Sequence, residues 1–288
     1  WGTLDMNRDT QFVRVIPIRE TLAPADPNAP LNATVVSTDL DSGRQFTWRD
    51  SVITFPDGRT GHVFYAPFRT RPGHTYRIEI SSAALALVTR VETTAPALPE
   101  AEVLPEEVTS VTTPGGADVR GSQEIVWRGI DDRPFQIEQW YRFLDLADQQ
   151  AFLDVQIPFE LNSGTGDRAN SWMVRLNLAG DQVFLSDSLN ALDTGGLLLA
   201  GLGQAIVVLD EAFVPPGGVF DPEILAQPGT LSNVENGFGF VGSIGRFSVE
   251  WTLSDEAART LGYTPASDLS PEKQAPGVQV RVRARPWE

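Results

Sequence analysis

Short runs of β-branched and aromatic residues, separated by turn residues, recur along the chain and constrain its fold more than any other feature. In one such run Tyr76, Ile78 and Ile80 alternate with polar residues, which is the pattern of a strand with one buried face. Turn sequences such as 41–43 and 71–74 separate the runs. The predicted strands are 11–18, 32–39, 44–50, 62–70, 74–81, 85–92, 123–129, 139–146, 151–161, 171–178, 203–213, 245–253 and 277–284. We therefore predict an all-β fold.

A segment rich in proline and glutamate, 92–109, divides the chain. Proline removes a backbone hydrogen-bond donor, so we do not expect a core strand to run through this segment. We predict an immunoglobulin-like β-sandwich at 1–95, a linker at 96–108 and a larger β-rich domain at 109–288. The pattern leaves open whether the larger domain is a sandwich or a barrel.

Two short helices are expected within the larger domain. Residues 254–261 start with Ser254, a good N-cap, carry acidic residues in the first turn and are followed by Gly262. A weaker helical pattern covers 268–273. No repeat of fixed period is present.

Two strands are candidate sheet edges through which copies of the chain could assemble. One is 11–18. The other is the C-terminal strand with Val280, Val282 and Arg283, where arginines alternate with small apolar residues as on a strand with one wet face. An added strand at such an edge supplies backbone hydrogen bonds.

Charge and cysteine content exclude several classes of function. The 288-residue chain has no cysteine, which rules out disulfides, thiolate metal sites and cysteine nucleophiles. Its 22 basic residues against 38 acidic ones give a net charge of −16 without a basic cluster, so nucleic acid is not expected as a partner. No apolar run approaches the ~20 residues of a membrane-spanning helix. The acidic charge fits an extracellular or salt-exposed surface and equally an ordinary acidic protein.

The sequence of 237–242, Gly-Phe-Gly-Phe-Val-Gly, has the G-x-G-x-x-G spacing of a dinucleotide-binding loop. That motif binds phosphate only where a strand precedes it and a helix follows. Here Phe247, Val249 and Trp251 alternate with polar residues directly afterwards, which predicts a strand instead. We interpret the glycines as relieving a bulge or a close backbone approach.

Further motifs each match a known site incompletely. Asp193-Thr-Gly resembles the aspartic-protease motif, but those enzymes use two carboxylates and the chain holds no second copy. Asp5, Asn7 and Asp9 have the alternating spacing of a calcium loop, yet Thr10 stands where that loop requires glycine. We predict no cofactor, with a looser calcium site in acidic loops as the open alternative.

Histidines and acidic residues supply the remaining candidates for catalysis. His62 and His74 are the two histidines, and we expect both at the surface rather than in a Ser-His-Asp triad, because no G-x-S-x-G elbow is present. A glycosidase needs only two carboxylates. Candidate acids for that role are Glu138, Asp145, Glu160, Asp210 and Glu211. Tryptophans that could stack on sugars, although core positions are expected instead, are Trp127, Trp140, Trp172 and Trp251.

The chain resembles an uncharacterised lipoprotein family of Bacteroidota. The matching features are Pro72-Gly-His-Thr-Tyr76, Ile125-Val-Trp127 and above all Ser232-Asn-Val-Glu-Asn-Gly-Phe-Gly-Phe-Val-Gly-Ser243. The resemblance implies an exported outer-membrane accessory protein with no known catalysis, encoded beside TonB-dependent receptors. The family's lipidated cysteine does not occur in this sequence, which begins at Trp1 as expected of a mature or trimmed product.

In this reading 232–243 form a glycine-rich corner rather than a cofactor loop. Asn233 and Asn236 suit turn positions, and Gly237, Gly239 and Gly242 permit tight backbone. A structural role is favoured over partner binding at this corner.

The sequence supports three hypotheses about function. The first is an exported, non-enzymatic cell-surface binding or accessory protein, partnered by an outer-membrane receptor or transporter. The second is a structural subunit that assembles through strand edges into a filament or surface layer. The third is a carbohydrate-active enzyme with paired carboxylates.

Overall fold

A computed structural model of the chain describes residues 1–16, 31–54, 58, 60–83, 85–114, 116–130, 134–145, 151–158, 165–168, 170–191, 197–213, 232–268 and 283–284. β-Strands make up most of these residues, which confirms the prediction of an all-β fold. Within them, no helix is both long enough and apolar enough to cross a membrane.

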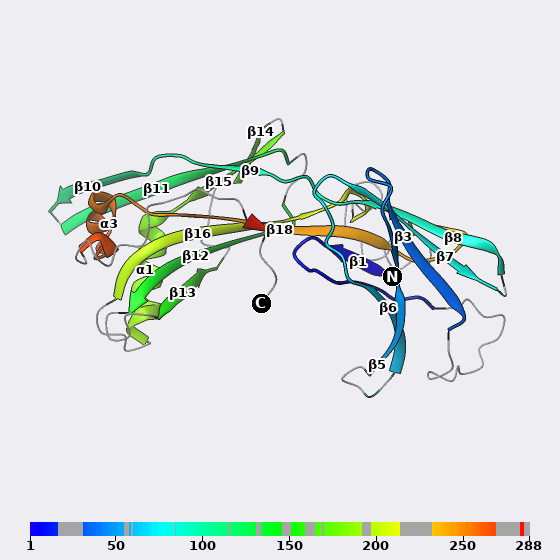
Figure 1. Cartoon of the computed structure of the whole chain (residues 1–288). Coiled ribbons are helices and arrows are strands. Elements are labelled where there is room, and N and C mark those ends of the chain that lie inside the picture. Colours follow the sequence, from blue (N-terminus) through cyan, green and yellow to red (C-terminus); the bar gives the residue numbers. More distant parts are fainter. Residues whose placement is uncertain are drawn as a thin grey trace, which may run out of the picture. The chain divides into compact units, whose positions relative to one another are not determined.

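The chain folds into two compact units, and neither is continuous in sequence (Figure 1). The first comprises Trp1–Leu98, Val208–Arg246 and Pro286–Glu288, and the second Pro99–Val207 and Phe247–Arg285. The first boundary, between Leu98 and Pro99, falls inside the predicted linker 96–108. The predicted division did not include the return of 208–246 to the first unit.

The first unit contains two sheets. One is part of a nine-stranded sheet and has the strand order β18-β1-β2-β6-β5, and the other is a five-stranded sheet with the order β17-β8-β7-β3-β4. The strands are β1 (Gly2–Asp5), β2 (Gln11–Val13), β3 (Ala33–Asp39), β4 (Gln45–Thr47), β5 (Arg49–Thr54), β6 (Thr60–Ala66), β7 (Thr75–Ser82), β8 (Leu85–Thr94), β17 (Val234–Glu235) and β18 (Val241–Trp251). The immunoglobulin-like strand order remains a prediction.

The pairing of β1 explains why 208–246 belong to the first unit. β1 runs parallel to β18 with Gly2 opposite Val241, although 238 residues lie between them in the chain. On its other side β1 pairs with β2, and β2 pairs in turn with β6. The prediction that 11–18 form a sheet edge is therefore wrong for Gln11–Val13, which have a strand on both sides.

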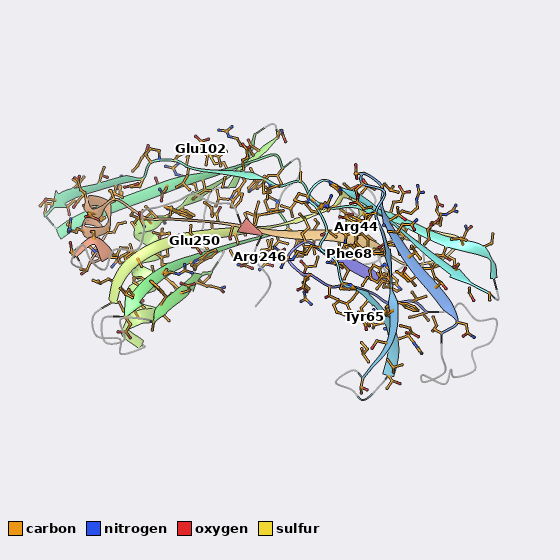
Figure 2. The ribbon with its side chains drawn as sticks, in the orientation of Figure 1. Arg44, Tyr65, Phe68, Glu102, Arg246 and Glu250 are labelled. Atoms are coloured by element: carbon orange, nitrogen blue, oxygen red, sulfur yellow. The ribbon has the colours of Figure 1, made fainter. Side chains whose placement is uncertain are left out.

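Aromatic side chains fill the core of the first unit. Phe68, labelled in Figure 2, stacks on Phe46 with ring centroids 4.1 Å apart and meets Trp48 edge-on at 5.9 Å. The indole N–H of Trp48 donates to Ser37 Oγ at 2.9 Å, so this buried donor has a partner. Tyr76 and Ile78, predicted from their alternation to face inward, are each 1% exposed.

The second unit also has two sheets. β13, β12, β16 and the C-terminal half of β18 follow one another in the first, and β19 pairs with β18. The second has the order β10-β11-β15-β14, with β9 also paired to β11. The elements are β9 (Glu100–Val103), β10 (Glu107–Thr113), β11 (Gly116–Arg128), β12 (Gln136–Asp145), β13 (Phe152–Ile157), β14 (Thr165–Arg168), β15 (Ser171–Leu176), α1 (Leu178–Ala191), β16 (Leu197–Leu209), α3 (Asp255–Thr260), η4 (Ala266–Asp268) and β19 (Arg283–Ala284).

Two tryptophans join the two sheets of the second unit. Trp127 on β11 donates its indole N–H to Gln204 on β16 at 2.7 Å, and Trp251 on β18 donates to Gln123 on β11 at 2.8 Å. With Trp140 they are at most 5% exposed. The prediction of core tryptophans is thus confirmed at these three positions, whereas Trp172 is half-buried.

Two local predictions had different outcomes, and one helix was not predicted. β9 lies inside the predicted linker and pairs with β11. Its four residues lie between Pro99 and Pro105, so no proline interrupts the strand. Helix α1 was not predicted at all. The helical pattern at 268–273 lies outside the described residues except for Asp268, which ends η4.

Helix α3 confirms the predicted helix at 254–261. Ser254 is its N-cap and accepts the backbone N–H of Ala257 at 3.2 Å, and Gly262 follows with a φ of 90°. Ser254→Ala should therefore lower the free energy of unfolding by about 1 kcal/mol, measured by urea denaturation. Ser254→Thr keeps the hydroxyl and serves as the control. Equal losses in both variants would contradict a capping role.

Candidate ligand pocket and buried carboxylate

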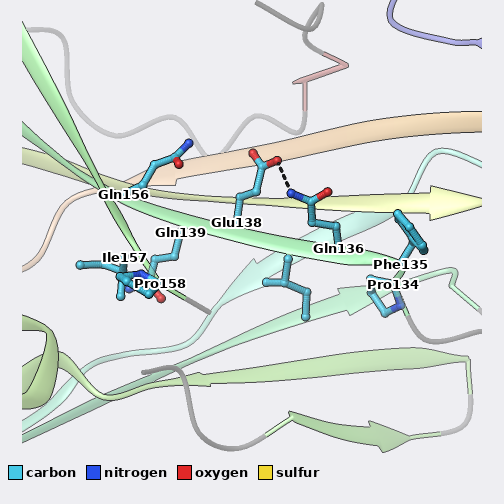
Figure 3. A pocket seen from close by; sticks show the side chains of 9 residues that line it. Pro134, Phe135, Gln136, Glu138, Gln139, Gln156, Ile157 and Pro158 are labelled. Carbon is cyan, nitrogen blue, oxygen red and sulfur yellow. Dashed lines mark hydrogen bonds between the residues drawn. The ribbon is translucent and has the colours of Figure 1, made fainter. Parts of the chain in front are cut away.

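A pocket of about 360 Å³ opens in the second unit where β13 ends (Figure 3). Residues 134–139 and 156–158 line it. Ile157, the last residue of β13, is opposite Gln139 on β12, and Pro158 follows without a backbone N–H to donate. Strand β12 thus continues past the described end of its neighbour, and its residues line the pocket.

The pocket combines an exposed aromatic ring with polar side chains. Phe135 is 64% exposed. Beyond it, Gln136 and Glu138 project from the same face of β12, since they are two residues apart, and Figure 3 shows Gln156 on that side as well. Gln136 Nε2 donates to Glu138 Oε1 at 3.1 Å. Among the described lining residues Glu138 is the one with an ionisable side chain.

Gln139 forms part of the pocket wall and belongs to a buried polar cluster. Its Nε2 donates to Asp181 Oδ2 at 2.8 Å, and Tyr141 donates its hydroxyl to the same oxygen at 2.9 Å. Gln139 and Tyr141 share the inner face of β12, again because they are two residues apart. Among the described residues, Asp181 Oδ1, Gln139 Oε1 and the hydroxyl of Tyr263 are buried without a hydrogen-bond partner.

Burial governs the ionisation of this cluster. Asp181 is fully buried, and this raises the pKa of its carboxyl from 3.8 to about 6. The hydrogen bonds from Tyr141 and Gln139 favour the ionised form and offset only part of that effect. Burial and the Asp181 charge together raise the pKa of Tyr141 well above its usual value. A carboxylate is therefore held ionised at neutral pH, against the preference of its surroundings.

Helix α1 positions Asp181, and sequence analysis missed both. Asn177 caps the helix: its Oδ1 accepts the backbone N–H of Gly180 at 3.0 Å. Asn177 before Leu178, with Asp181 in the first turn, was the available signal. The alternation in 171–178 predicted a strand up to Leu178, and no apolar stripe of helical period follows to reveal the helix.

The predicted glycine-rich corner lies in the first unit, between β17 and β18. Asn233 holds it together, because its side chain donates to Val241 O at 2.7 Å and accepts from Val241 N at 3.1 Å. Asn236 has a φ of 55°, the left-handed conformation that asparagine tolerates, and Gly239 has a φ of 144°. Strand β18 begins at Val241, so the glycine motif leads directly into a strand and not into a helix. This geometry does not match a dinucleotide loop.

The remaining carboxylate candidates belong to several different segments. Asp210 is buried in the first unit, where Thr93 donates its hydroxyl to it, and burial raises the pKa of Asp210. Glu138 lines the pocket and Asp145 ends β12. Glu211 begins η2 (Glu211–Phe213), and Glu160 lies outside the described residues.

The aspartate-rich N-terminal segment is a closed turn in the structure. Asp5 accepts the backbone N–H of Asn7 at 2.8 Å and pairs with Arg8 at 3.2 Å. Asn7 exchanges two hydrogen bonds with the backbone of Arg246. Asp9 is exposed. The carboxylate of Asp5 thus bonds within this turn, and the side-chain oxygen of Asn7 bonds to β18. Asp193 of the Asp-Thr-Gly motif lies outside the described residues.

Both histidines pair with aspartates. His62 is 8% exposed and its Nδ1 lies 2.8 Å from Asp50. The prediction of a surface position is wrong for His62, because it shares the buried face of β6 with Phe64 and Ala66. His74 Nδ1 lies 3.0 Å from Asp39, and together with Asp41 these form the one group of possible metal ligands among the described residues. Asp39 also accepts the backbone N–H groups of two turn residues, which explains the cluster without an ion.

The predicted C-terminal edge is only partly within the described residues. Arg283 belongs to β19 and is opposite Ser248 on β18, while Val280 and Val282 lie outside the described part of the chain. The comparisons with known proteins add no assignment: no family model matches the chain, and no curated protein matches it.

Proposed function

We propose that the chain is an exported, non-enzymatic binding protein of the cell surface that assists an outer-membrane receptor or transporter. The binding role rests on the pocket at 134–139 and 156–158, which joins an exposed aromatic ring to several polar side chains. Glycoside hydrolysis requires two carboxylates, and the described lining offers Glu138 alone, which supports binding over catalysis.

The export, the surface location and the receptor partner rest on the sequence of 232–243. That segment resembles the Bacteroidota lipoprotein family, and the proposal includes the family's immunoglobulin-like first domain and an anchor outside this sequence. The net charge of −16 is compatible with a surface exposed to solvent and salt.

A second candidate function, assembly through strand edges, has one specific observation in its favour. Among the described residues β5 is hydrogen-bonded to a strand on one side only, and it carries Val52 at 46% and Ile53 at 36% exposure. In natural proteins, charged side chains or a covering segment usually prevent such an edge from pairing with another chain. A neighbouring copy of the chain would cover this one.

Cell fractionation and particle mass test the proposal together. We expect an epitope-tagged chain expressed in its own cells to separate with the outer membrane and to be cleaved by protease added to intact cells. Light scattering of the detergent-solubilised particle should give a monomer or a complex with one large membrane protein. A cytosolic location would contradict the proposal. A long homopolymer would support the edge-assembly function instead. Ile53→Lys, which places a charge on the β5 edge, should then convert the polymer to monomers.

A further inference from the structure

The side chains around the pocket restrict what it can bind. Glu138 carries an acidic side chain, and no lysine, arginine or histidine is among the described lining residues, so the described lining offers an anionic ligand no positively charged partner. The amides of Gln136 and Gln156 both donate and accept hydrogen bonds, and the Glu138 carboxylate accepts them. A ligand with many hydroxyl groups matches this mixture, because each hydroxyl also donates and accepts.

Phe135 adds the second requirement. The ring is 64% exposed, so its apolar surface is in contact with water. A ligand with a flat apolar face would remove that surface from water, and this would favour binding. Pyranose rings have such a face, formed by C–H groups, with hydroxyls at the perimeter. Phe135 directly precedes β12, and Gln136 and Glu138 lie on that strand immediately after it, so one ligand can contact both the ring and the polar row (Figure 3).

Two features restrict the conformations open to the pocket wall. Pro134 and Pro158 limit the backbone at the two ends of the lining segments. Gln139 is held by its hydrogen bond to Asp181 and is 1% exposed. Preorganisation of this kind reduces the entropy lost on binding.

We infer that this pocket binds a neutral saccharide, stacked on Phe135 and hydrogen-bonded to the polar row of Gln136, Glu138 and Gln156. The inference rests on the proposed binding function. The pocket volume of about 360 Å³ lies at the lower end of the range of about 300–1,000 Å³ for small-molecule sites, which suits a mono- or disaccharide.

Saturation-transfer NMR and calorimetry on the purified chain test the inference. The probes are neutral gluco-, galacto- and manno-disaccharides, with glucuronate as the anionic probe and glucosamine as the cationic one. At least one neutral disaccharide should bind at millimolar concentration or below. Phe135→Ala should weaken its binding about tenfold, the factor that corresponds to about 1.4 kcal/mol. Phe152→Ala is the matched control, since Phe152 is 58% exposed on β13 but does not line the pocket.

Glu138→Gln separates ligand charge from ligand shape. It keeps the size of the side chain, so a neutral saccharide should lose affinity only about threefold, while a cationic ligand should lose about tenfold or more. Glucosamine or glucuronate bound at Phe135 in preference to every neutral sugar would overturn the saccharide inference and leave the binding function intact. Binding by no probe, or binding that Phe135→Ala leaves unchanged, would also overturn it. The surface location is judged separately by fractionation.

Discussion

Asp181→Asn should remove a loss of stability that the wild-type chain shows as pH rises from about 4 to about 6. The folded-state pKa of Asp181 is about 6, against an ordinary value of 3.8, because the carboxyl is fully buried. Between these two values the folded state binds a proton that the unfolded state has released. Stability therefore falls as pH rises through this window, and above it the effect is complete.

The size of the effect follows from proton affinity. A tenfold difference in proton affinity corresponds to about 1.4 kcal/mol, so full ionisation of Asp181 destabilises the fold by about 3 kcal/mol. Asparagine carries no charge, keeps an oxygen for the hydroxyl of Tyr141 and offers an amide N–H to Gln139 Oε1, which has no partner in the wild type. Above pH 6 the variant should be the more stable protein.

Urea denaturation at a series of pH values between 4 and 8 measures both parts of this prediction. Other groups also shape the pH profile. Burial raises the pKa of Asp210, whereas at Asp39 and Glu106 hydrogen bonds outweigh the effect of burial and lower the pKa, so the stability that these two contribute is lost only toward the acid end of the series. These contributions persist in the variant, so the difference between the two curves isolates Asp181. Asp187→Asn, at an exposed position on the same helix, is the control and should leave the profile unchanged. A variant profile with the wild-type slope would show that Asp181 is not buried as an ion.

Strand locations could be predicted from the sequence, because alternation is a local property. Tyr76 and Ile78 face the core as predicted, and α3 starts at the N-cap that its sequence indicates. Strand pairing is not local. Nothing in Gly2–Asp5 indicates that it lies parallel to residues 241–244, and this pairing places 208–246 in the first unit. A division into consecutive domains could not anticipate that exchange.

The candidate site could not be predicted from the sequence, for a related reason. Glu138 was named as a possible catalytic acid from its residue type alone, and it lines the pocket. The pocket itself depends on where β13 ends relative to Gln139, which is a matter of register and not of composition. Asp181 lies in a helix whose polar and apolar residues show no clear stripe, and its contact with β12 spans 42 residues of sequence. Local patterns carry no information about such contacts.

Gly242→Ala should destabilise the chain by about 1–3 kcal/mol, and the reason bears on the G-x-G-x-x-G spacing. A Cβ at this position would lie 2.2 Å from Cε2 of Phe213, far inside van der Waals contact. Phe213 packs against Phe240 with ring centroids 4.7 Å apart, so its ring has little room to move. The last glycine of the motif is thus required by an aromatic ring that lies over the backbone of β18.

A double-mutant cycle with Phe213→Leu tests this explanation by urea denaturation. The smaller side chain leaves room for a methyl group, so Gly242→Ala should be much less destabilising in the Phe213→Leu background than in the wild type. If the glycine instead served a nucleotide, the two substitutions would be additive, and NAD added to the wild-type chain would raise its unfolding midpoint. Additivity within about 0.5 kcal/mol would contradict the packing role. Strong coupling with no effect of NAD would establish that the glycine spacing at 237–242 reflects how a strand enters the sheet beneath Phe213.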